Sequence, residues 1–221
     1  MLHVVVETNW VVDCCAPAHN RVQGALDLLA RAGRGDIRLY VPAFCLHEAK
    51  RPLQRKFQPR TEADKVRKYV QWGLADGRVT QEEDATVRRI LDQMENAVRT
   101  DLARIDESIR NLAGSTGVEV VPYDDEMMRR AFDLGFSIPD VGPHDPAILA
   151  TVLVRAERLL ANGTRDLYFC ELDGDLQPWD KNGNPRTRLT ELYDSANVWV
   201  CNDYLLENPP APEGWHNRKR A

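Results

Sequence analysis

Several carboxylates of this 221-residue chain stand where apolar segments end. Glu7 directly follows the apolar run 2–6, and Asp173 and Asp175 follow the apolar run 167–170. In an open parallel sheet, ligands bind in the crevice beyond the carboxyl ends of the strands. A charge directly after a buried strand also needs a partner or a cation. These acids are therefore candidates for a shared site.

Two further acids are expected at the same edge. Glu48 lies on a helix just after the expected strand 37–41, and Asp145 begins the expected helix 146–161. Converging carboxylates repel one another unless a cation or a proton intervenes, and hard oxygen ligands select Mg²⁺ or Mn²⁺. One or two such ions bind a phosphate oxygen and lower the pKa of a water, so the predicted chemistry is phosphodiester hydrolysis.

Each acid also has a purely structural interpretation. Asp145 before Pro146 has the pattern of a helix N-cap followed by proline in the first turn. The sequence Asp173-Gly-Asp175 is also typical of a turn, and Glu48 is also compatible with a solvated position on a helix. The prediction of a metal site therefore depends on the joint placement of these residues.

The elements that must position these acids alternate along the chain. The expected strands are 2–6, 37–41, 118–121, 167–170 and 198–201, and the expected helices are 20–32, 43–50, 125–134 and 146–161. The polar residues after the first strand are interpreted as a turn, and the region 177–190 as a long loop. Strands separated by helices imply an α/β fold, a three-layer sandwich with a mostly parallel central sheet.

Residues 61–112 have a different pattern, because they are nearly all helical. A capping box at Thr80 precedes one expected long helix that ends at Leu112, and a shorter helix is expected at 61–74. About 32 residues at 1.5 Å each give roughly 48 Å, so a projecting α-helical hairpin insertion is predicted at about 53–116. Pro52 and Pro59 are expected to break the preceding helix. One domain is expected over 1–206, with a disordered tail at 207–221.

Composition narrows the class of protein. The formal net charge of −5 argues against a simple basic nucleic-acid binder but is compatible with a carboxylate metal site. The five histidines show no zinc-site spacing, and the five cysteines fit reduced thiols in a cytoplasm. No apolar run approaches the roughly 20 residues of a membrane helix, so no membrane association is expected.

Together these segments resemble the PIN domain, a metal-dependent nuclease fold. The matching stretches are Val4–Asp13, Val41–Glu48, Asp145–Val152 and Tyr168–Leu176, in that order. The resemblance implies a quartet with catalytic and metal-binding roles, made of Glu7, Glu48, Asp145 and Asp173. It implies Asp175 as an auxiliary metal ligand and Asn9 as a residue that orients the first carboxylate or a metal-bound water. The family usually has Asp where Glu7 stands.

By this resemblance the chain is expected to be a cytoplasmic endoribonuclease that uses Mg²⁺ or Mn²⁺ on single-stranded RNA. The family also suggests an antitoxin-like protein as a partner, and a homodimer is a further expectation. The alternative is a catalytically impaired PIN-like module that binds RNA or protein. A phosphatase of the haloacid-dehalogenase type is disfavoured, because Glu171 occupies the position of its nucleophile.

Basic residues near both ends of the expected site are candidates for substrate binding. They are Arg51, Arg55 and Lys56 after Glu48, and Arg186 and Arg188 in the late loop. Such residues can guide a phosphate backbone, and Trp179 in the same loop offers a stacking surface. A merely solvated basic face is the alternative interpretation for the first group.

Overall fold

The computed structural model of the chain describes residues 1–58, 60–138, 142–164, 167–180 and 182–206. Its centre is a five-stranded parallel sheet in the order β3-β2-β1-β4-β5. The strands are β1 (Leu2–Val6), β2 (Ile37–Pro42), β3 (Val118–Val121), β4 (Leu167–Cys170) and β5 (Val198–Cys201). The prediction of an α/β fold with a parallel sheet is thereby confirmed.

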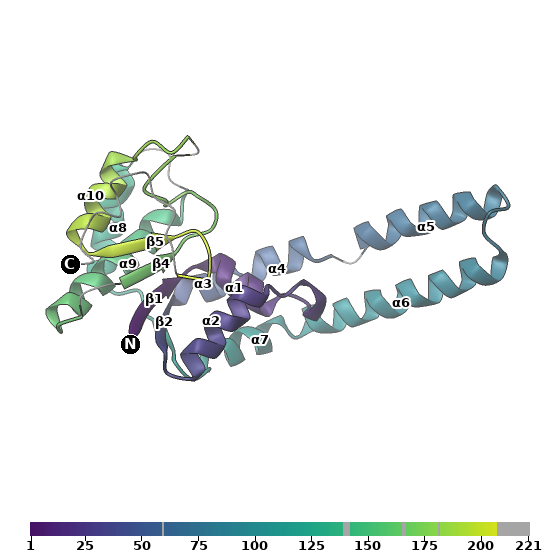
Figure 1. Ribbon diagram of the computed structural model, residues 1–221, viewed down its shortest axis with the longest axis horizontal. Helices are drawn as coiled ribbons and strands as arrows, with labels where there is room; N and C mark the ends of the chain where they lie inside the picture. The colour runs from purple at the N-terminus through teal and green to yellow at the C-terminus, as the bar shows by residue number, and fades with distance from the viewer. Residues whose placement is uncertain (59, 139–141, 165–166, 181, 207–221) are drawn as a thin grey trace.

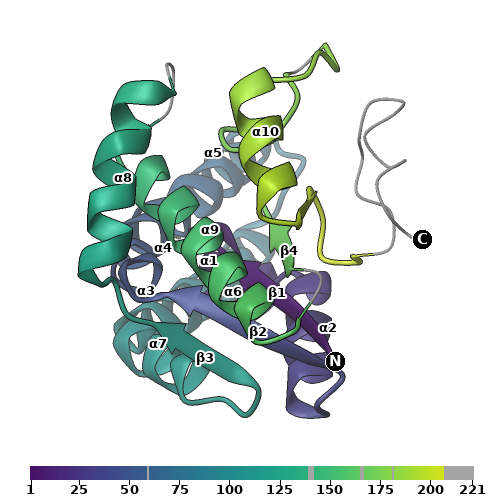
Figure 2. The ribbon, with the colours of Figure 1, turned by 90° about the vertical axis from the view of Figure 1, so that its left-hand side faces the viewer.

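Helices cover both faces of the sheet, as Figures 1 and 2 show. One face carries α1 (Thr8–Cys15), α2 (Gln23–Gly33) and α7 (Ile105–Ala113). The other face carries α8 (Asp125–Ser137), α9 (Asp145–Ala161) and α10 (Thr187–Ser195). The chain changes face after β3, because it returns across the sheet to place β4 beside β1, and right-handed crossovers then put the later helices on the opposite side.

The core lies between these layers. Val4, Val5 and Val6 of β1 are fully buried, as are Phe169 of β4 and Leu153 of α9. Strands buried on both faces read as continuous apolar runs, which explains why their sequences show no alternation of polar and apolar residues. Within the described residues, none of the helices combines the length and the apolarity that a membrane crossing would need.

Two helices were not predicted. Helix α1 was interpreted as a polar turn, but its residues Trp10 to Cys15 are buried almost all round, because they pack against α7 and α3 (Ala43–Glu48). A helix without a polar face lacks the periodicity by which helices are predicted. Helix α10 occupies residues of the expected long loop and the segment after it. Its buried residues Leu189, Leu192 and Tyr193 have helical spacing.

Several predicted boundaries are wrong for local reasons. Helix α2 begins at Gln23 because 18–20 form a separate 3₁₀ turn, η1 (Ala18–Asn20). The helix expected at 43–50 ends earlier, at Glu48, as α3. Pro52 lies in the first turn of the next helix, α4 (Lys50–Lys56), where no backbone N–H is required. Helix α8 continues through Gly135 to Ser137. Pro59 and the expected tail 207–221 lie outside the described residues.

Two long helices extend away from the sheet (Figure 1). Helices α5 (Arg60–Ala75) and α6 (Gln81–Ala103) pack against each other, and we call the segment 60–103 the arm. The predicted capping box is present, because the Thr80 side chain accepts from the Glu83 backbone and the Glu83 side chain accepts from the Thr80 backbone. The expected single helix that ends at Leu112 is divided at Arg104, where α7 turns to bury Ile105 and Ile109 in the core.

Candidate metal centre

The sheet has a topological switch point between β1 and β4. From β1 the chain proceeds to β2 and β3 on one side, and it then returns to β4 and β5 on the other. Ligands bind at such a point in open α/β sheets, beyond the carboxyl ends of the strands. Val6 and Cys170 are paired in register. The next residues, Glu7 and Glu171, therefore stand side by side at the switch point.

Glu7 is a buried carboxylate with two hydrogen-bond donors. Its Oε1 accepts from the backbone N–H of Leu172 and from Nδ2 of Asn9, both at 3.1 Å. Burial and the nearby carboxylates of Asp173 and Asp145 raise the pKa of Glu7 to about 7, although the two hydrogen bonds act in the opposite direction. Glu7 is therefore only partly ionised near neutral pH unless a cation is present.

Glu171 is the site residue that sequence reasoning missed. It is 0% exposed, and its Oε1 accepts from the backbone N–H groups of Gly174 (2.9 Å) and Leu176 (3.2 Å). Its Oε2 is buried without a hydrogen-bond partner. Burial raises the pKa of Glu171 to about 10, with further contributions from Asp173 and Glu7. The signal was the one used for Glu7, an acid directly after a buried strand.

Asp173 lies in a tight turn that directs its carboxylate toward these two residues. Gly174 has φ +92°, a conformation that favours glycine, and Asp173 Oδ1 accepts from the Asp175 backbone N–H at 3.2 Å. The Glu171 carboxyl, as a hydrogen-bond partner, lowers the pKa of Asp173. The proton of this pair therefore belongs to Glu171. The backbone bends at this segment, and the bend brings Asp173 close to Glu7 and Glu171.

Three of these carboxylates are close enough to share one ion. One oxygen each from Glu7, Glu171 and Asp173 lies within 4.8 Å of the other two. Asn9 bridges two of them, because its Nδ2 donates to Glu7 and, at 3.4 Å, to Asp173 Oδ2. Asn9 thus lies where the predicted orienting residue should be.

Asp145 lies at the start of α9, but it is not the N-cap. The N-cap is His144, and Asp145 Oδ2 instead accepts from the Gly142 backbone N–H at 2.5 Å. Burial raises the pKa of Asp145, and the carboxylates of Asp175, Asp173 and Glu48 contribute to the increase. This electrostatic coupling places Asp145 in the same group of acids.

Glu48 and Asp175 complete the group. The Thr8 hydroxyl donates to Glu48 Oε2 at 2.5 Å, which ties the end of α3 to the first residue of α1. Glu48 is half-buried, so it is not simply a solvated side chain, whereas Asp175 is exposed. We call the whole group the acidic edge: Glu7, Glu48, Asp145, Glu171, Asp173 and Asp175. The predicted quartet is included in it.

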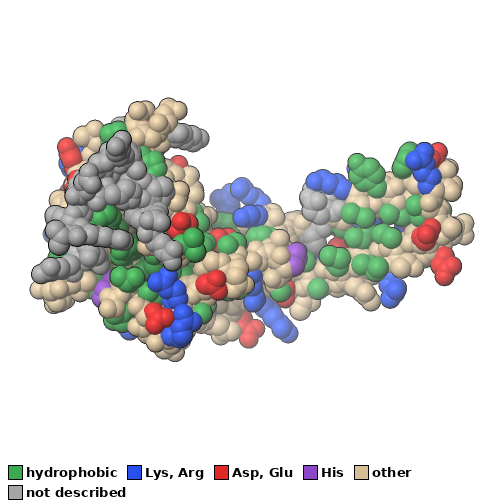
Figure 3. Space-filling view, in the orientation of Figure 1, with side chains coloured by type: hydrophobic (Ala, Val, Ile, Leu, Met, Phe, Trp, Pro, Cys, Tyr) green, Lys and Arg blue, Asp and Glu red, His purple; other side chains and the backbone are tan. Residues whose placement is uncertain are grey.

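The predicted basic residues have different surroundings. Arg186 Nη1 donates to the carbonyl oxygens of Asp175 (2.5 Å), Gly174 and Gln177 (both 3.4 Å), so it stabilises the loop that carries Asp173. Arg188 is exposed and forms an ion pair with Glu191 at 3.5 Å. Figure 3 shows Lys and Arg side chains gathered over the region of α4, the helix of Arg51, Arg55 and Lys56, all of which are exposed.

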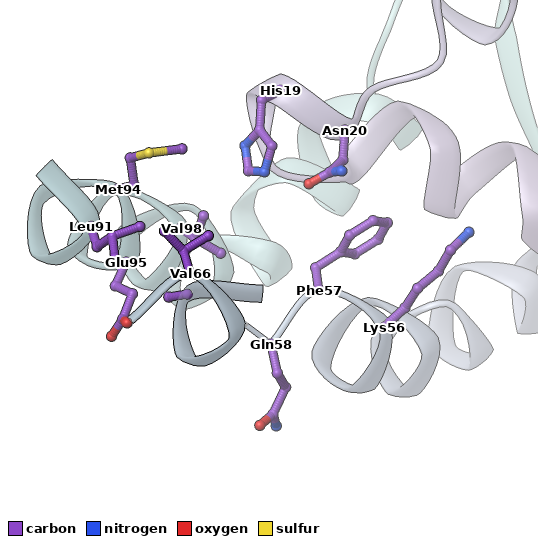
Figure 4. A pocket seen from close by; sticks show the side chains of 11 residues that line it. His19, Asn20, Lys56, Phe57, Gln58, Val66, Leu91, Met94, Glu95 and Val98 are labelled. Atoms are coloured by element: carbon purple, nitrogen blue, oxygen red, sulfur yellow. The ribbon is translucent and has the colours of Figure 1, made fainter. Parts of the chain in front are cut away.

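A separate cavity of about 300 Å³ lies at the base of the arm (Figure 4). It is bordered by η1, the end of α4 and the helices α5 and α6, and side chains such as Phe57, Leu91 and Val98 line it. Apolar residues predominate in this lining, and none of the acidic-edge residues takes part in it. This cavity is therefore not part of the candidate metal centre.

Comparison of the chain with protein-family models, with curated proteins and with solved structures gave no match.

Proposed function

We propose that this chain is a divalent-metal-dependent nuclease that hydrolyses phosphodiester bonds at the acidic edge, with single-stranded RNA as the substrate. The observation that carries the proposal is the convergence of Glu7, Glu171 and Asp173 at the switch point of a parallel sheet. The order of the motifs that resemble the PIN domain supports the same assignment.

The residues present fit Mg²⁺ or Mn²⁺. The donor atoms are all carboxylate oxygens, which these hard ions prefer. The charged neighbours that most strongly shift the pKa values of Glu7 and Asp145 are other carboxylates. The buried Glu171 Oε2 lacks a hydrogen-bond partner, and a proton or a cation would complete its environment. An ion there would replace the protons that now limit the repulsion.

Each residue has a definite part in this proposal. Glu7, Glu171 and Asp173 would hold a cation, and the raised pKa of Glu171 means that it releases a proton when the ion binds. Asp145 and Glu48 extend the negative surface on the side of α9 and α3. A bound ion would polarise a phosphate oxygen and lower the pKa of a water. Asn9 would hold Glu7 and Asp173 in position.

Cleavage of a labelled single-stranded RNA, followed with Mg²⁺ or Mn²⁺ and with EDTA, tests the proposal. Asp173→Asn and Asp145→Asn are expected to abolish cleavage while circular dichroism remains unchanged. Asp133→Asn serves as a matched control, because this exposed acid lies on α8 outside the acidic edge. Equal cleavage by the wild type and both site variants would place the activity elsewhere, in this protein or in a contaminant.

The second candidate is a module that binds RNA without cutting it. The observation that favours it is Glu7, which is longer than the Asp usual in the PIN family and has a raised pKa. Glu7→Asp separates the two functions. If the wild type binds RNA without cutting it and Glu7→Asp cuts it, the site is that of an impaired nuclease.

A further inference from the structure

Four side chains on one face of α5 combine positive charge with exposed aromatic rings. Lys65, Lys68, Tyr69 and Trp72 are spaced by three and four residues, so they share one side of the helix. Tyr69 is 76% exposed and Trp72 is 57% exposed. Together the four side chains border a shallow hollow of about 500 Å³. We call this group the α5 face.

The packing of the arm fixes the direction of the α5 face. On another side of α5, Arg67 forms ion pairs with Asp92 (2.9 Å) and Glu95 (2.6 Å) of α6. Ala63 is buried there. The α5 face therefore points away from α6, and Figure 3 shows hydrophobic side chains exposed along the arm, with basic and acidic side chains among them.

Trp72 is held in place by a cation on one side. The Arg78 guanidinium lies 5.1 Å from the centre of the Trp72 ring, and Arg78 is itself paired with Asp76. Such a cation–π contact orients the ring without burying it. An oriented, exposed indole offers a flat surface for stacking.

We propose that the α5 face binds single-stranded nucleic acid, with bases stacked on Tyr69 and Trp72 and phosphates close to Lys65 and Lys68. Aromatic stacking beside basic residues is the mode by which proteins hold single strands without sequence preference. The local positive charge complements a polyanion even though the whole chain has a net charge of −5. As the outer part of a substrate path, this inference rests on the nuclease function proposed above.

The path of the chain connects the α5 face to the acidic edge. Glu48 ends α3, and α4 and α5 follow it directly. At 1.5 Å per residue, α4 and the first half of α5 together span about 25 Å. A stacked strand advances about 3.4 Å per nucleotide, so roughly eight nucleotides are needed to reach both surfaces. A shorter oligonucleotide can occupy only one of the two surfaces at a time.

The test is fluorescence anisotropy of the full chain with a fluorescein-labelled 20-nucleotide single-stranded RNA in EDTA. We expect Tyr69→Ala/Trp72→Ala to weaken binding at least about tenfold, because both stacking surfaces are removed. Phe132→Ala/Phe136→Ala is the matched control, because these aromatic residues of α8 are equally exposed, and it should remain within about twofold. Lys68→Gln should reduce the slope of log affinity against log salt by about one.

Three outcomes would overturn the proposal. One is affinity of the aromatic variant within twofold of the wild type, and another is an equal loss in the α8 control. The third is a dimer in sedimentation that Tyr69→Ala/Trp72→Ala dissociates while RNA affinity stays the same, since the face would then be a protein interface. Lys68→Gln provides a second test if the aromatic variant does not fold.

This test can be separated from that of the nuclease function, because EDTA removes any metal-dependent cleavage. A wild type that binds RNA through the α5 face but never cleaves it retains this inference and loses the nuclease proposal. A wild type that cleaves RNA without any contribution from Tyr69 and Trp72 retains the nuclease proposal and loses this inference.

Discussion

The arm and the acidic edge each contain a buried glutamate, and the two are neutralised in different ways. Glu95 of α6 has ion pairs with Arg67 at 2.6 Å and with Arg99 at 3.1 Å. Glu171 has two backbone N–H donors, and its charged neighbours Asp173 and Glu7 are carboxylates. The arm thus supplies its own counter-charge. The acidic edge requires a proton or an ion from outside.

This difference separates a structural glutamate in the arm from a candidate metal ligand at the acidic edge. The Oε1 atom of Glu95 has no hydrogen bond of good geometry, but it lies 2.6 Å from an Arg67 nitrogen, so its charge is compensated. The Glu171 carboxyl instead adjoins the carboxylate of Asp173, so that a proton or a cation must lie between them. A carboxyl group whose pKa is strongly raised by burial and by neighbouring carboxylates is characteristic of functional sites. The four predictions below test the comparison.

The largest expected effect is the loss of metal binding in Glu171→Gln. An amide cannot supply the anionic oxygen, so Mn²⁺ affinity measured by calorimetry should fall by about 100-fold or more, since even outer-shell changes cost about 10–100-fold. Glu95→Gln should bind Mn²⁺ as the wild type does. Undiminished binding by Glu171→Gln would contradict the assignment of this residue.

The second prediction concerns pH in the absence of metal. Because the folded-state pKa of Glu7 is raised from 4.5 to about 7, the folded protein retains a proton that the unfolded chain loses, and its stability falls as pH rises across that window. Glu7→Gln should therefore match the wild type in Tm below pH 4.5 and exceed it at pH 8 in EDTA. A constant Tm difference at all pH values would refute this.

The third prediction contrasts the two glutamates in stability. Glu95→Gln removes the charge that pairs with Arg67 and Arg99, so its Tm should be lower by about 2–4 °C, the shift produced by roughly 1 kcal/mol in a protein of this size. Glu171→Gln in EDTA should leave Tm nearly unchanged, because Glu171 is already protonated there and the neutral amide can donate to Asp173 in its place. Tm is measured by thermal unfolding of both variants. Equal decreases in the Tm of Glu95→Gln and Glu171→Gln would contradict the proposed difference between the two glutamates.

The smallest expected effect is that of Thr8→Val, which removes the hydroxyl that donates to Glu48. Glu48 would lose its fixed orientation but retain its charge. We expect a few-fold lower Mn²⁺ affinity with nearly unchanged Tm, because Glu48 adds to the negative surface beside the ion rather than to its ligands. Thr100→Val is a suitable control, because that exposed hydroxyl donates only to its own helix.

Much of the sheet could be predicted from the sequence, whereas two helices could not. The five strands are short and largely apolar segments, so their positions can be predicted, and the strand order places Glu7 and Asp173 together. Helix α1 was not predicted, because its helical conformation depends on packing against neighbouring elements and its own sequence has no clear periodicity. The break at Arg104 has the same origin, since the core that buries Ile105 is assembled from distant segments.

The candidate site was predictable in outline for a similar reason. Glu7 and Asp173 follow strands, which is local information, but the pairing of Val6 with Cys170 that sets Glu171 beside Glu7 is a property of the folded sheet. Likewise, the position of Arg186 in a late loop suggested substrate binding, and only the fold shows that its Nη1 holds the Asp173 loop.

The central claim, that the acidic edge holds a divalent cation, is tested most directly by anomalous diffraction from crystals of the protein soaked in Mn²⁺. We predict an anomalous peak coordinated by Glu7, Glu171 and Asp173, with Asn9 still bridging Glu7 and Asp173. An acidic edge that remains free of anomalous density at saturating Mn²⁺ and pH 8, with the three carboxylates arranged as they are here, would contradict the claim.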